Sequence, residues 1–150
     1  MFFNLPLKSL IYLIIKIYQV FFEDNIVIYL ISLCGITKKI KELIDFSYGS
    51  PGRCIVNLQF WLSLSTSLRQ KLEIQLNNPI ELLKLAKEIT DELNIEQQLW
   101  LIDFQQNRAW IKEKNSNIVI QLEELRKQLL KFVQPRLAWE VTLLEINFLN

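Results

Sequence analysis

The stretch 77–93, NNPIELLKLAKEITDEL, decides the fold class of most of this chain. Asn78 is a favourable N-cap, Pro79 suits the first helical position because its missing N–H would be unpaired there, and Glu81 follows three residues after the cap. The apolar residues after it recur at helical spacing: Leu82, Leu85, Ala86, Ile89 and Leu93. An amphipathic helix is therefore predicted from Pro79 onward.

Similar patterns follow on the C-terminal side. In 94–114, Asn94 and Gln97 repeat the capping signal. The side chains that we expect on its buried face are Leu99, Trp100, Phe104, Trp110 and Ile111. Leucines recur at helical spacing in 118–133, and Pro135 both ends that helix and opens a last one over 135–149.

The region before 77 is also helical in character. Residues 36–48 form an amphipathic pattern, and 61–78 is a serine-rich connection that leads into a helical or loop segment. The sequence therefore predicts an all-α fold over 36–150.

Residues 48–54 read YGSPGRC and have two possible interpretations, a phosphate-binding loop and the start of a helix. Arg53 and Cys54 stand where a phosphate loop requires Lys and Ser or Thr, so that motif is absent. Ser50 as N-cap and Pro51 at the first position favour a helix start, and Gly49 accepts a backbone conformation that other residues resist. We expect Ile55, Val56, Leu58 and Leu62 on the buried face of that helix.

Arg53 lies in the first turn of this helix, where acidic residues are preferred. Two interpretations follow, an arginine aimed at an anion and a solvated surface arginine.

The composition excludes several chemistries. The 150 residues contain 17 basic and 16 acidic side chains and no histidine. The charge balance gives no argument for nucleic-acid binding, and histidine-based metal sites and nucleophile pairs are excluded. The two cysteines, Cys34 and Cys54, suggest no metal cluster, so we expect no catalytic residues, no metal and no enzyme activity.

Residues 1–34 are apolar and aromatic and are left unassigned. The charge-free stretch 25–37 is shorter than the roughly 20 apolar residues that a membrane-spanning helix needs. A buried or partner-covered segment, a membrane-associated segment and a poorly folding stretch all remain open. Glu23 and Asp24 are expected to mark a turn between two apolar runs.

Two motifs in order carry a resemblance. GSPGRCIVNL at 49–58 and QPRLAWEVTLLEI at 134–146 resemble the C-terminal part of the bacterial clamp-loader delta-prime subunit of DNA polymerase III. Relatives have a GSPGRA helix start in the lid of their AAA+ module and an all-α collar domain whose last part reads NPRLAxE. The resemblance covers about residues 35–146 and implies a helical lid remnant at 35–74 and a helical collar-type bundle at 75–150.

The resemblance also implies roles for particular residues. Ser50 and Arg53 match the sensor-2 position that faces a nucleotide phosphate. The chain lacks a phosphate-binding loop, however, which leaves open whether Arg53 is vestigial. Pro135, Arg136, Trp139 and Glu140 are implied as a subunit interface, with Trp139 equally compatible with the domain core. Arg136 and Glu140 are spaced for an i,i+4 ion pair.

The implied function is that of a non-catalytic subunit that contributes to assembly of the clamp-loading complex in DNA replication. Its partners would be the motor and delta subunits in the cytoplasm, with DNA and the sliding clamp reached only through the complex. The chain would need no cofactor, because ATP is bound by the motor subunits. Two alternatives remain, a membrane-peripheral helical protein anchored by residues 1–34 and a truncated remnant without function.

Overall fold

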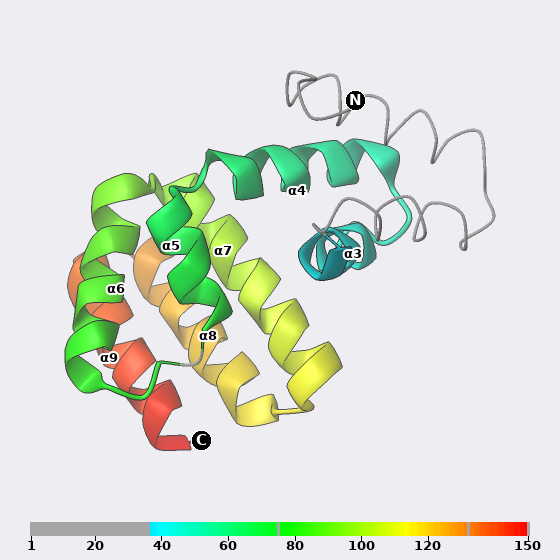
Figure 1. Ribbon diagram of the computed structural model, residues 1–150. Coiled ribbons are helices and arrows are strands. Elements are labelled where there is room, and N and C mark those ends of the chain that lie inside the picture. The colour runs from blue at the N-terminus through cyan, green and yellow to red at the C-terminus, as the bar shows by residue number, and fades with distance from the viewer. Residues whose placement is uncertain (1–36, 75, 132, 150) are drawn as a thin grey trace. The chain divides into compact units, whose positions relative to one another are not determined.

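The computed structural model describes residues 37–74, 76–131 and 133–149, and in these ranges the chain is helical without any strand (Figure 1). The predicted all-α class is thus confirmed for the described residues. The chain divides into two compact units, 1–62 and 63–150, of which the first is described from residue 37. The predictions for residues 1–34, including the turn at Glu23 and Asp24, lie outside the described residues.

The first unit contains α3 (Thr37–Asp45) and α4 (Pro51–Ser63), joined by a tight turn. In that turn Ser47 N–H donates to the Ile44 carbonyl at 2.9 Å, and Gly49 has a φ of 73°. This left-handed conformation is the reason a glycine is favoured there, as the sequence predicts.

Helix α4 begins as predicted. The Ser50 hydroxyl accepts the backbone N–H of Arg53 at 3.4 Å, and the Ser50 carbonyl accepts that of Cys54 at 3.0 Å. The predicted buried face is wrong at Val56, which is exposed, while Leu58 is buried. The reason is Asn57, which is 6% exposed and turns inward to a polar contact with Ser47.

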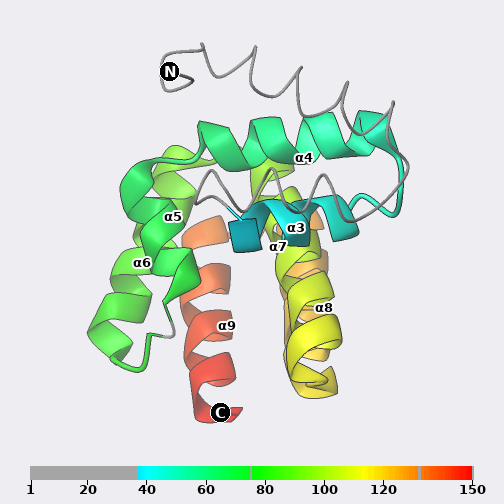
Figure 2. The same ribbon diagram turned by 45° about the vertical axis from the view of Figure 1, so that its right-hand side comes forward.

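The second unit contains α5 (Thr66–Glu73), α6 (Pro79–Glu92), α7 (Ile95–Arg108), the π-helix η1 (Ala109–Glu113), α8 (Ser116–Leu130) and α9 (Pro135–Leu149). Helix α9 packs against α6 and α8, and α8 packs against α7. Figure 2 shows the same helices turned by 45°, with α5 beside α6. This arrangement is a helical bundle with α5 attached to its side.

Local capping explains where two of these helices start. Asn78 accepts the N–H of Ile80 at 2.9 Å with Pro79 at the first helical position. Asn94 and Gln97 form a reciprocal capping box, in which the Gln97 N–H donates to Asn94 at 2.9 Å and the Asn94 N–H donates to Gln97 at 3.0 Å. Both predicted starts are confirmed.

The serine-rich connection contains a helix, α5, that starts at a cap of its own. The Ser65 hydroxyl accepts the N–H of Leu68 at 3.1 Å. Ser67 donates to Glu88 of α6 at 2.7 Å, and Lys71 pairs with the same carboxylate. These contacts hold α5 against α6 of the bundle. The predicted boundary between a lid remnant and a collar domain at residue 74 stays a prediction.

Apolar residues of the four long helices form the core of the second unit. Those on α6 and α7 are Leu82, Leu85, Ala86, Ile89, Leu101, Ile102 and Phe104, and those on α8 and α9 are Ile118, Leu122, Leu125, Leu129, Ala138 and Trp139. Burial of this apolar surface is the main favourable contribution to the stability of the bundle.

The predicted buried face of 94–114 is only partly right, because Leu99 and Trp100 are half-buried while Leu101 and Ile102 are buried, and it is wrong at its end. Phe104 is buried and stacks in parallel with Trp100 at a centroid distance of 5.5 Å, but Trp110 is 56% and Ile111 48% exposed. A π-helix carries an additional residue in each turn, so η1 shifts the residues after Arg108 out of the 3.6-residue register. Ala109 takes the buried position instead.

None of the described helices is both long and apolar enough to span a bilayer.

Candidate functional site

The start of α9 carries the residues predicted to form a subunit interface. Arg136 Nε donates to Glu140 Oε1 at 2.8 Å, which confirms the i,i+4 pair. The Arg136 side chain is about half exposed and that of Glu140 is partly exposed. Both can therefore be reached by a partner, and so can the partly exposed Pro135.

Trp139 lies in the interior, with only 2% of its surface exposed. Its indole N–H donates to Gln98 Oε1 at 2.9 Å, and the Gln98 amide N–H donates to the Leu93 carbonyl at 2.8 Å. Of the two alternatives left open for Trp139, the structure places it in the domain core. The interface prediction stays a prediction and now rests on its three solvent-accessible neighbours.

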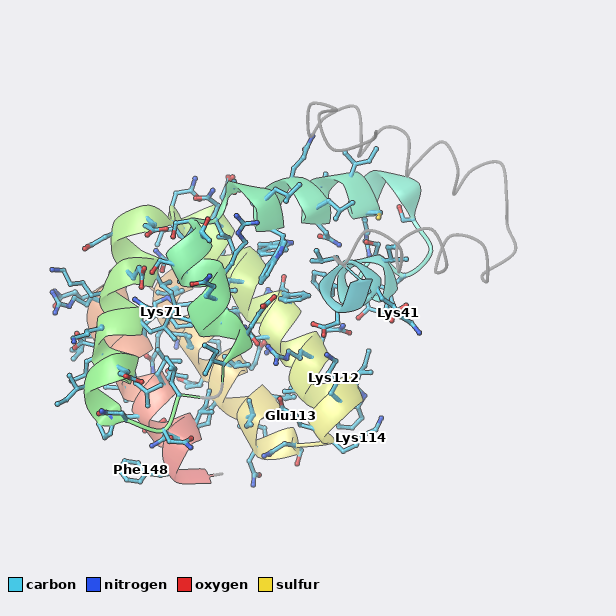
Figure 3. All side chains as sticks on the ribbon, viewed as in Figure 1. Lys41, Lys71, Lys112, Glu113, Lys114 and Phe148 are labelled. Atoms are coloured by element: carbon cyan, nitrogen blue, oxygen red, sulfur yellow. The ribbon has the colours of Figure 1, made fainter. Side chains whose placement is uncertain are left out.

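An apolar stripe runs along α9 on the side that faces solvent. Leu137 is 52%, Val141 43% and Phe148 81% exposed, with the partly exposed Leu144 between them. Spacings of four, three and four residues put these side chains on one face of a helix. We call Leu137, Val141, Leu144 and Phe148 the α9 stripe, and Figure 3 labels Phe148 at its C-terminal end.

The α9 stripe was missed by the sequence prediction, which named only the first residues of this helix. The spacing was readable in PRLAWEVTLLEINFL. Every face of this helix carries apolar residues, however, so spacing alone could not separate the buried face from the exposed one.

The predicted nucleotide-facing residues lie together at the start of α4. Ser50 uses its hydroxyl as the helix cap, and Arg53 is exposed in the first turn. The nucleotide-facing role of Ser50 and Arg53 stays a prediction.

The described residues contain no cluster of side chains able to hold a metal ion. Cys54 is a free thiol, and burial raises its pKa, against a smaller opposing effect of a hydrogen bond with Ser47. A raised pKa keeps the thiol protonated and therefore poorly nucleophilic. Cys34 lies outside the described residues.

Comparison with known proteins identifies a family. Residues 32–146 match the family model described as cyanobacterial DNA polymerase III delta prime, C-terminal domain. No curated protein and no solved structure matches the chain. The matched range includes all the described helices up to Ile146 of α9.

Proposed function

Because the chain belongs to the family of cyanobacterial DNA polymerase III delta prime C-terminal domains, we propose that it helps to assemble the clamp-loading complex as a non-catalytic subunit. Delta prime is a clamp-loader component, so the chain carries a domain of a replication subunit. The match over 32–146 is the observation that carries the proposal.

The α9 stripe supports a role in assembly. It places three large, exposed apolar side chains on one helix face, beside the Arg136–Glu140 pair. Burying such residues in an interface is favourable, and a neighbouring ion pair adds orientation specificity. We propose that this face, including Arg136 and Glu140, contacts another clamp-loader subunit.

The partners in this proposal are the motor and delta subunits, in the cytoplasm where the chromosome is replicated. DNA and the sliding clamp are reached through the complex and not by this chain directly. ATP is bound by the motor subunits, so this chain carries no cofactor of its own.

The test is size-exclusion chromatography of the 150-residue chain mixed with motor and delta subunits, without nucleotide. We expect co-elution in one complex. Val141→Asp, which places a charge in the α9 stripe, should weaken the assembly by about tenfold or more, as loss of a central interface residue commonly does.

Ile80→Asp is the matched control, because Ile80 is also exposed but lies on α6. Equal weakening by both variants would indicate a general loss of solubility instead of a specific contact. If the unaltered chain elutes separately from the other subunits, the proposed role in assembly is wrong.

A further inference from the structure

A cavity of about 580 Å³ opens in the second unit, between α5, α6, α7 with η1, α8 and α9. Part of its lining is apolar, with the buried Leu85, Ile89, Leu101 and Leu122 and the half-buried Leu143 and Ile146. This volume lies in the range of about 300–1,000 Å³ typical of sites for small molecules. The cavity is thus large enough for a ligand with an apolar body.

Charged side chains also line the same cavity, namely Lys71, Glu73, Arg108 and Glu113. Lys71 already pairs with Glu88, so its charge is balanced within the domain. Figure 3 labels Lys71 on α5 and Glu113 at the end of η1. Of the two cationic side chains that line the cavity, Arg108 is the one whose charge is not already paired in this way.

Arg108 has a hydrogen-bonding group in need of an acceptor. Its Nη1 donates to the Leu72 carbonyl at 3.0 Å, which fixes the guanidinium beside the end of α5. Its buried Nε has no hydrogen-bond partner among the described residues. Arg69 and Arg126 have a similar buried Nε, but neither lines the cavity. A buried donor without an acceptor lowers stability, and a ligand acceptor would remove that cost.

The backbone beside Arg108 is unusual at the same place. The π-helix η1 begins at Ala109, and both Ala109 and Glu113 line the cavity. This π-helical turn closes the end of α7, where Lys114 has a left-handed conformation with a φ of 52° and its N–H donates to the Ala109 carbonyl. The irregular turn, the unpaired donor and the cavity therefore coincide.

We propose that this cavity binds an apolar monocarboxylate, with the carboxylate on the Nε edge of Arg108 and the apolar body against the leucine and isoleucine lining. A planar carboxylate matches the guanidinium edge. Glu73 and Glu113 also line the cavity and repel any anion, and because this repulsion grows with the charge of the ligand, phosphates and dicarboxylates are disfavoured more than a monocarboxylate. Alkyl and aromatic carboxylates share this chemistry, and the experiment separates them.

Binding is measured by isothermal titration calorimetry on the 150-residue chain, with dodecanoate and 2-naphthoate as probes. Their uncharged counterparts are 1-dodecanol and 2-naphthylmethanol. We expect at least one carboxylate to bind about tenfold or more tightly than its uncharged counterpart, since one charge-assisted hydrogen bond commonly accounts for this much. The probe that binds shows whether the tail is alkyl or aromatic.

Two variants and a control test the geometry. Arg108→Gln should weaken carboxylate binding by about tenfold or more and leave the binding of the uncharged probe unchanged. Arg69→Gln removes an arginine that has a similar buried Nε but does not line the cavity, so it should alter neither affinity. Ile146→Trp fills the cavity and should abolish binding of both probes.

Absence of binding by both carboxylates overturns the proposal, as does an unchanged carboxylate affinity in Arg108→Gln. Circular dichroism checks that Arg108→Gln keeps its helices, because this variant also loses the bond to Leu72. If it unfolds, Ile146→Trp decides, and binding retained by that variant overturns the proposal.

Discussion

Trp139 and Gln98 are joined by a hydrogen bond of 2.9 Å that connects the start of α9 to the first turn of α7. Gln98 is 2% exposed and also donates to the Leu93 carbonyl, at the end of α6. One amide side chain thereby links three helices of the bundle in the middle of an apolar core. If an apolar residue replaced Gln98, the Trp139 indole N–H and the Leu93 carbonyl would both be buried without this hydrogen-bond partner.

We predict that Gln98→Leu lowers the free energy of unfolding by about 2–4 kcal/mol, because two buried polar groups lose their partners. Urea denaturation followed by circular dichroism measures the change. Gln70→Leu on α5 is the control, since Gln70 is exposed and should change stability by less than about 0.5 kcal/mol. A Gln98→Leu variant as stable as the wild type would show that this amide does not hold the helices together.

A second buried polar contact joins α4 to the turn after α3. Asn57 donates to the Ser47 hydroxyl at 2.9 Å, and that hydroxyl donates to the Leu43 carbonyl at 2.6 Å. Asn57→Ala should destabilise the first unit by about 1–2 kcal/mol, because one hydrogen bond is lost in a buried place.

Hydrogen exchange of the backbone amides in 37–62 measures this effect directly. The control is Gln59→Ala in the same helix, where the side chain is exposed. Equal exchange rates in the two variants would contradict the importance of the Asn57 contact.

The third prediction concerns the carboxylate of Glu88. Burial opposes its charged form, but hydrogen bonds from Lys71 and Ser67 and the charge of Lys71 together lower its pKa below the ordinary value. A lowered pKa in the folded state stabilises the protein above the pKa of the unfolded state. That stabilisation is lost as the pH falls through the folded-state pKa.

Glu88→Gln should therefore be less stable than wild type at neutral pH, and the difference should shrink on acidification. Urea midpoints at pH 7 and in strong acid give the comparison. Glu145→Gln, in which an exposed glutamate of α9 is replaced, is the control for the loss of a surface charge. If the stability difference between wild type and Glu88→Gln stays the same or grows in acid, the lowered pKa of Glu88 does not stabilise the fold as predicted.

The fourth prediction separates the two residues at the start of α4. Ser50→Ala removes a helix cap and should lower stability by about 0.5–1 kcal/mol. Arg53→Ala changes an exposed residue and should leave stability within about 0.5 kcal/mol.

If Arg53 meets a nucleotide phosphate, its removal should also reduce any strengthening of clamp-loader assembly by ATP. Size-exclusion chromatography with and without ATP measures this quantity. An ATP effect that is the same in Arg53→Ala and wild type would identify Arg53 as vestigial.

The helix starts could be predicted from the sequence because the contacts that make them span only a few residues. Asn94 reaches Gln97 three residues away, and Ser50 reaches the N–H of Arg53 at the same separation. The i,i+4 pair of Arg136 and Glu140 is local in the same sense. Because such contacts join residues only three or four positions apart, the sequence alone was enough to predict the all-α class.

The tertiary structure alone decided what each helix face meets. Trp139 was compatible with a core or an interface until its contact with Gln98, 41 residues away, placed it inside. Trp110 and Ile111 follow an apolar pattern, yet η1 turns them to solvent. The physical reason is the same in both cases: helical spacing fixes which residues share a face, but only packing against distant residues determines whether that face is buried.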